Sequence, residues 1–136
     1  MATVLYVEDD RSSAEPLTLF LRRRGHSVVC TTNGEEALST LLIVSPDVIV
    51  LDLQMPLMDG VEFLNILRCY RKWAELPVVI VTADSPLLDR VTQLGGAKPA
   101  NVVNIFRKPL TYSDIAASID QCAPPKAAAR GGGSMN

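Results

Sequence analysis

Short apolar runs alternate along this chain with stretches in which apolar residues recur at helical spacing. The runs are rich in valine and isoleucine, and they lack the alternation of apolar and polar positions that marks a half-buried strand. Such runs are typical of strands that are buried on both faces of a parallel sheet. We expect five of them, at residues 3–7, 26–31, 48–51, 78–81 and 101–107.

Helix signals follow each run. Asn33 and Asp59 are placed to cap two of the helices, and Gly25 is placed to end the first. The first helix should begin at about residue 12 or 13, with Pro16 in its first turn, where a missing N–H is tolerated. Regular alternation of strand and helix predicts a single α/β domain, with a doubly wound, five-stranded parallel sheet covered by five helices.

The length sets the number of domains. A chain of 136 residues is long enough for one domain with a substantial core and too short for two ordinary ones. We expect residues 1–123 to form this domain. Residues 124–136 are rich in proline, alanine and glycine and offer no apolar surface to bury, so we expect them to be disordered.

Composition and charge exclude several classes of function. The net charge is −2, so we expect no direct contact with nucleic acid, and no apolar stretch is long enough to predict a membrane span. The three cysteines lack C-x-x-C spacing and the chain begins without a signal peptide, which favours a reducing, cytoplasmic location. The single histidine, His26, is expected at the surface and gives no support to a zinc site or a Ser-His-Asp triad.

Polar residues stand where four of the apolar runs end. They are Glu8, Asp9, Asp52, Thr82 and Lys108. Taken singly, each is more simply explained as a turn, cap or ordinary strand residue. The carboxyl ends of parallel strands lie along one edge of the sheet, however, and ligands bind at that edge. We therefore expect all five side chains to converge on one site.

The chemistry of these residues indicates phosphoryl transfer. Carboxylates packed together repel one another unless a cation lies among them, and hard oxygen ligands favour Mg²⁺ over Zn²⁺. A Lys108 ammonium can bind a phosphoryl oxygen, and the Thr82 hydroxyl can donate to the same group. A carboxylate such as Asp52, beside both Mg²⁺ and a cation, is equipped to attack phosphorus and form an aspartyl phosphate.

Four motifs carry a resemblance to a known family. They are V-E-D at 7–9, D-L-Q-M-P-L-M-D-G at 52–60, T-A at 82–83 and K-P at 108–109. Over roughly residues 3–122 the chain resembles the receiver domain of bacterial two-component response regulators, of the chemotaxis-regulator type, which has a flavodoxin-like fold.

The resemblance implies a role for each site residue. It makes Asp52 the phosphoacceptor, and it has Glu8 and Asp9 hold Mg²⁺ together with the backbone carbonyl of Gln54. Thr82 and Lys108 would engage the phosphoryl group, and the Lys108–Pro109 bond would be cis. The implied donor is a sensor histidine kinase or a histidine phosphotransfer protein, and the implied recipient of the signal is a downstream effector protein.

Two features depart from the pattern of that family. Ile105 stands three positions before Lys108, where the family usually has an aromatic residue whose rotamer accompanies phosphorylation. In addition, residues 98–104 lengthen the usually short link before this position. The effector-binding surface is therefore expected to differ from the family pattern near this link.

These observations predict a signalling domain rather than an enzyme with a metabolic substrate. The domain would promote its own phosphorylation and dephosphorylation and switch a partner-binding surface. One alternative is a receiver-like module that binds a partner without phosphorylation, which Ile105 and the lengthened link keep open. The other is an aspartate-nucleophile phosphatase, but that class needs D-x-D on one strand, and position 54 is Gln.

Overall fold

Five parallel strands form the centre of the molecule. The computed structural model describes residues 1–83, 85–93 and 101–122. The strands are β1 (Thr3–Val7), β2 (Ser27–Thr31), β3 (Val48–Leu51), β4 (Val78–Thr82) and β5 (Val102–Arg107). They are hydrogen-bonded in the order β2-β1-β3-β4-β5, and every pair is parallel.

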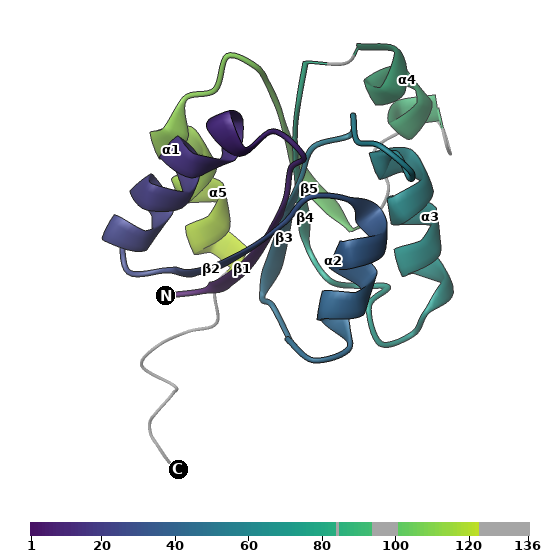
Figure 1. Ribbon diagram of the computed structural model, residues 1–136, viewed down its shortest axis with the longest axis horizontal. Helices are drawn as coiled ribbons and strands as arrows, with labels where there is room; N and C mark the ends of the chain where they lie inside the picture. The colour runs from purple at the N-terminus through teal and green to yellow at the C-terminus, as the bar shows by residue number, and fades with distance from the viewer. Residues whose placement is uncertain (84, 94–100, 123–136) are drawn as a thin grey trace.

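Helices cover both faces of this sheet. They are α1 (Arg11–Arg23), α2 (Gly34–Leu41), α3 (Gly60–Cys69), α4 (Ser85–Gln93) and α5 (Tyr112–Cys122). Figure 1 shows α1 and α5 on one face and α2, α3 and α4 on the other. The predicted doubly wound α/β fold is confirmed.

Burial on both faces explains the continuous apolar runs. Val4 and Tyr6 of β1 pack in the core cluster beneath α1 and α5, whereas Leu5 and Val7 pack in the cluster beneath α2, α3 and α4. All four side chains are almost completely buried. Because neither face of the strand meets water, neither set of alternate positions can be polar.

Local signals set most of the helix ends. The Asn33 side chain accepts a hydrogen bond from the Glu36 N–H (2.8 Å), and Asp59 forms a reciprocal capping box with Glu62. Gly25 follows α1 with a φ of +94°, a conformation that glycine adopts without strain. These expectations are confirmed.

The expected start of α1 was wrong by one or two residues. Asp10 caps this helix by accepting from the Ser12 N–H at 2.9 Å, so α1 begins at Arg11. Pro16 consequently lies in the second turn, where the helix loses the bond that would reach the Ser12 carbonyl.

His26 is buried, which corrects the expectation that it lies at the surface. Only 5% of the residue is exposed. Its Nδ1 accepts the backbone N–H of Ala2 at 2.9 Å, and its Nε2 lies 3.0 Å from Oδ1 of Asp120 in α5. Since Nδ1 is an acceptor, Nε2 carries the proton and donates to Asp120. The sequence near His26 could not show this, because α5 follows 86 positions or more later in the chain.

A bulge sets the register of β5. Val78 pairs with Val102, but Val79 pairs with Asn104, so Val103 is left without a partner in the β4 ladder. The shift places Ile105 opposite Ile80, where it packs against the core cluster beneath α2, α3 and α4. Of the predicted link at 98–104, positions 98–100 lie outside the described residues, Asn101 leads into β5, and positions 102–104 are the first residues of that strand.

One further expectation falls outside the described residues: the disordered tail at 124–136, with the domain boundary at 123. Within the described ranges, no helix combines the length and apolar character needed to cross a membrane.

Candidate functional site

The strand order brings the ends of β1 and β3 together. These strands are neighbours, and Val7 is in register with Leu51, so the next residues, Glu8 and Asp52, lie side by side. The ladder continues past the strands, because the Asp52 N–H donates to the Val7 carbonyl at 3.0 Å. The backbone therefore holds both carboxylates at the edge where the parallel strands end.

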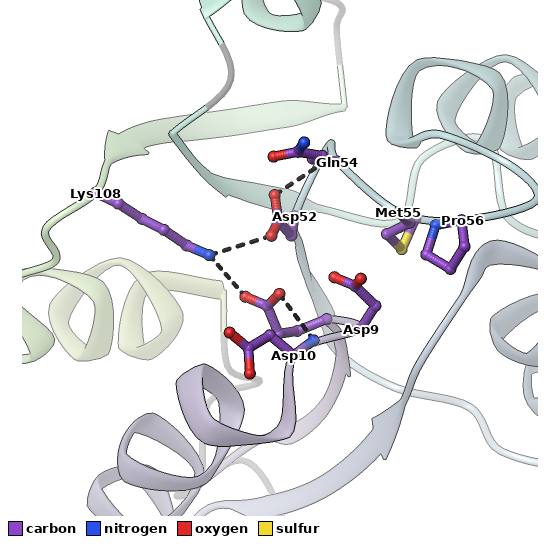
Figure 2. Close-up of a pocket in the computed structure, with 8 residues that line it drawn as sticks. Asp9, Asp10, Asp52, Gln54, Met55, Pro56 and Lys108 are labelled. Carbon is purple, nitrogen blue, oxygen red and sulfur yellow. Dashed lines mark hydrogen bonds and ion pairs between the residues drawn. The ribbon is translucent and has the colours of Figure 1, made fainter.

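Three carboxylates form one acidic cluster. Oxygen atoms of Glu8, Asp9 and Asp52 lie within 4.8 Å of one another. The side chains of Glu8 and Asp52 are only 2% and 6% exposed, whereas Asp9 is exposed to solvent. These acids lie at an open pocket of about 470 Å³ (Figure 2), whose lining residues are Glu8, Asp9, Asp10, Asp52, Gln54, Met55, Pro56 and Lys108.

Lys108 bridges the two buried carboxylates. Its Nζ donates to Oε1 of Glu8 at 2.9 Å and to Oδ2 of Asp52 at 3.1 Å (Figure 2). The Lys108–Pro109 bond that follows is cis, as the resemblance implied. The ammonium therefore offsets part of the negative charge that the strand ends bring together.

Burial and charge alter the acidity of two of these groups. Burial raises the pKa of Glu8 to about 7, a rise to which Asp52 contributes and which the hydrogen bond from Lys108 opposes. Burial lowers the pKa of Lys108, but its hydrogen bond to Glu8 and the charge of Asp52 outweigh that effect, so this pKa is raised overall. Lys108 is thus held as an ammonium, whereas ionisation of the buried Glu8 carboxyl group is unfavourable.

Backbone groups orient the two buried acids. The Gln54 N–H donates to Oδ1 of Asp52 at 3.1 Å, and the Asp10 N–H donates to Oε2 of Glu8 at 3.3 Å. Gln54 lines the pocket, as expected from its motif. Asp10, Met55 and Pro56 also line it. Sequence reasoning gave these three no role at the site, although Met55 and Pro56 belong to the motif at 52–60 and Asp10 directly follows the motif at 7–9.

Thr82 occupies a different position from the other candidates. It ends β4, next to β3, and is 1% exposed. Its carbonyl accepts the Lys108 N–H at 3.0 Å, so its backbone helps to place the lysine. Thr82 is absent from the residues that line the pocket, whereas Glu8, Asp9, Asp52 and Lys108 line it.

Comparisons with known proteins agree with this geometry. The sequence profile of the response regulator receiver domain matches residues 4–120. Transcriptional regulatory protein AfsQ1 of Streptomyces coelicolor is 37% identical over 94 residues, which are 69% of this chain and 40% of that protein. DNA-binding response regulator MtrA of Mycolicibacterium smegmatis is 33% identical over 104 residues, 76% of this chain and 44% of that protein. This chain spans less than half the length of these relatives.

Solved structures show the same fold. The signal receiver domain of a signal transduction histidine kinase from Syntrophus aciditrophicus superposes with a TM-score of 0.78 at 26% identity, covering 90% of this chain and 89% of that chain. Chemotaxis protein CheY4 of Vibrio cholerae superposes with a TM-score of 0.75 at 27% identity, covering 90% and 98%. With the profile match, the curated relatives and these structures in agreement, the chain belongs to the response regulator receiver domain family of two-component systems.

Proposed function

We propose that this receiver accepts a phosphoryl group on Asp52 from a phosphohistidine of a sensor histidine kinase or histidine phosphotransfer protein. One observation carries the proposal. Two nearly buried carboxylates, Glu8 and Asp52, share one ammonium, Lys108, at the mouth of an open pocket. Removing two carboxylates and an ammonium from water carries a large free-energy cost, and such an arrangement is typical of a functional site rather than of a structural ion pair.

The acidic cluster has the dimensions of a magnesium site. Oxygen atoms bound to one Mg²⁺ lie about 2.1 Å from the ion, and hence about 3 to 4 Å from one another. The oxygens of Glu8, Asp9 and Asp52 already lie within 4.8 Å. Asp9 is exposed and free to move the remaining distance. We assign Mg²⁺ to these three carboxylates and to the backbone carbonyl of Gln54.

The chain's own groups then have separate tasks in the transfer. An Asp52 oxygen forms a bond to phosphorus as the phosphorus–nitrogen bond of the donor breaks, and the imidazole nitrogen keeps the electron pair and takes a proton from water. Lys108 exchanges a carboxylate oxygen for a phosphoryl oxygen, and Thr82 donates its hydroxyl to the same group. Bound Mg²⁺ would supply positive charge to the phosphoryl oxygens.

Partners follow from this chemistry. The phosphorylated domain would act on a downstream effector protein, from a cytoplasmic location. MtrA is described as DNA-binding, but this chain matches less than half of it. With a net charge of −2 for the chain, we expect this domain to make no direct contact with nucleic acid.

Phosphorylation by acetyl phosphate and Mg²⁺, followed by intact mass measurement, tests the assignment of Asp52. The wild type should gain one phosphoryl group, and Asp52→Asn should gain none. Asp10→Asn is a matched control, because Asp10 lines the same pocket but lies outside the three-carboxylate cluster. No phosphate on the wild type would favour a receiver-like module that works without phosphorylation, whereas phosphate on Asp52→Asn would mean that another residue is the acceptor.

Calorimetric titration with Mg²⁺ tests the metal ligands separately. Asp9→Asn should abolish most of the binding heat, whereas Asp10→Asn, one residue further along, should retain it. Equal heats for the wild type and Asp9→Asn would show that Mg²⁺ binds elsewhere.

A further inference from the structure

An apolar groove lies between α2 and α3, away from the acidic pocket. It has a volume of about 250 Å³, and its lining residues are Leu38, Ser39, Leu42, Ile66, Tyr70 and Trp73. Leu42 and Tyr70 are 68% and 54% exposed, and the adjacent Ile43 is 86% exposed. Large apolar side chains that gather around a groove in this way mark an interaction site more often than isolated exposed ones do.

Charge changes sign from one end of this groove to the other. Glu35 lies in the first turn of α2 and Glu62 in the first turn of α3. Residues four apart share a helix face, so Glu62 and Ile66 form a row along α3, and Tyr70 follows the helix as its C-cap residue. Beyond the end of α3, Arg71 and Lys72 are exposed, and Lys72 Nζ lies 5.9 Å from the centre of the Trp73 ring. Glu75 is the single acid among residues 68–77.

We propose that a second copy of this chain docks on the α2–α3 groove across a two-fold axis. A two-fold interface pairs one patch with itself, so the patch must be self-complementary. With the axis perpendicular to α2 and α3, the helices of the two copies run antiparallel. In this arrangement α3 of one copy lies opposite α3 of the other, so the acidic end of α3, at Glu62, faces the basic end of the second copy's α3, at Arg71. Opposite helix ends also face each other, which their dipoles favour.

Apolar contacts complete the interface. In the antiparallel arrangement Leu42, Ile43 and Tyr70 of each copy cover the groove of the other and leave solvent. This face lies on the side of the sheet opposite α1 and α5 (Figure 1). Its formation requires neither Mg²⁺ nor phosphorylation, so the proposal stands independently of the chemistry assigned to Asp52.

The size of the face sets the strength of the dimer. Helices of 8 and 10 residues are about 12 and 15 Å long. Two such helices side by side present a face of on the order of 300 Å² in projection, well below the roughly 800 Å² per partner of a standard stable interface. The dimer is therefore weak, with a dissociation constant of about 100 µM or more.

Sedimentation equilibrium tests the proposal between about 20 µM and about 1 mM protein. The wild type should shift from monomer toward dimer over this range. Leu42→Lys should raise the dissociation constant at least about tenfold, because it places a charge in the apolar contact. Leu19→Lys is the matched control: Leu19 is 48% exposed on α1, on the other face of the sheet, and its replacement should leave association unchanged.

Charge reversal tests the orientation of the two copies. Glu62→Lys and Arg71→Glu should each weaken the dimer about threefold or more, and combining them should restore it to within about twofold of the wild type. A wild type that stays monomeric at about 1 mM would overturn the proposal. An effect of Leu19→Lys equal to that of Leu42→Lys, or a double variant as weak as the single ones, would overturn it as well.

Discussion

Replacing Gly60 with alanine should strain the backbone that carries the acidic site. A Cβ at this position would lie 2.6 Å from Cα of Leu53 and 3.1 Å from the carbonyl oxygen of Asp52. Carbon atoms in favourable contact are about 3.5 to 4.0 Å apart, so the segment after β3 or the start of α3 would have to move by about 1 Å. The Leu53 backbone resists this movement, because its carbonyl accepts the Gly60 N–H at 2.7 Å.

The expected loss of stability follows from two opposing terms. Forcing an extra carbon into a packed site typically costs about 1 to 3 kcal/mol, and more when backbone has to move. Alanine recovers at most about 1 kcal/mol of helix propensity over glycine. We therefore expect Gly60→Ala to lower the free energy of unfolding by about 1 to 3 kcal/mol. It should also weaken Mg²⁺ binding, because the displaced segment includes Asp52.

Gly34→Ala is the matched control. Gly34 is the first residue of α2, as Gly60 is of α3, and the three atoms nearest to its Cβ would all belong to the Met58 side chain, with Sδ at 2.7 Å. A flexible thioether can move aside, so the change should be within about 0.5 kcal/mol of the wild type. Urea unfolding followed by circular dichroism measures both variants. Equal stabilities for the two alanine variants would refute the argument from backbone contact.

Three further predictions concern titratable groups. His26→Ala should lower the free energy of unfolding in urea by about 2 to 4 kcal/mol, because it leaves the Ala2 N–H without its acceptor and opens a cavity. Asp120→Asn keeps an oxygen acceptor, so it should lower this free energy by about 1 kcal/mol or less. Equal losses would contradict the role of the buried ring. Because the pKa of Glu8 is raised to about 7, protons should compete with Mg²⁺ for this carboxylate. The affinity of the protein for Mg²⁺ should therefore fall about tenfold from about pH 8 to about pH 6. Equal Mg²⁺ affinities at the two pH values, measured by calorimetry, would show that Glu8 is not a ligand. At about pH 9, the Lys108→Ala variant should bind Mg²⁺ at least about threefold more tightly than the wild type, because it removes a positive charge from the acidic cluster. Weaker binding by this variant in the same titration would show that Lys108 holds the carboxylates in place.

Elements with a local physical cause could be predicted from the sequence. The apolar runs predicted all five strands, because a strand that is buried on both faces must be apolar throughout. Asn33 and Asp59 were identified as caps because a cap bonds to a backbone N–H only two or three residues away. The expectation that acids would meet at one sheet edge needed only parallel strands, and Glu8, Asp9 and Asp52 do meet there.

Features that join distant segments were decided by the tertiary structure. His26 is buried because Asp120, 94 positions later, closes over it, and no pattern near His26 shows that contact. The bulge at Val103 determines that Ile105 faces the core beneath α2, α3 and α4, whereas the apolar run around it fits either face.

The electrostatics of the site also required the packed structure. The residues alone predicted that Lys108 would lie near the acids, but its bridge between Glu8 and Asp52 depends on how far each side chain reaches from its own strand end. The sequence showed no sign that the pKa of Glu8 is raised, because that shift comes from the protein atoms that exclude water around the carboxylate. By itself the sequence determined which chemical groups lie at the edge of the sheet. Their exposure, contacts and charge depend on packing between segments that are far apart in the chain, and these only the tertiary structure decided.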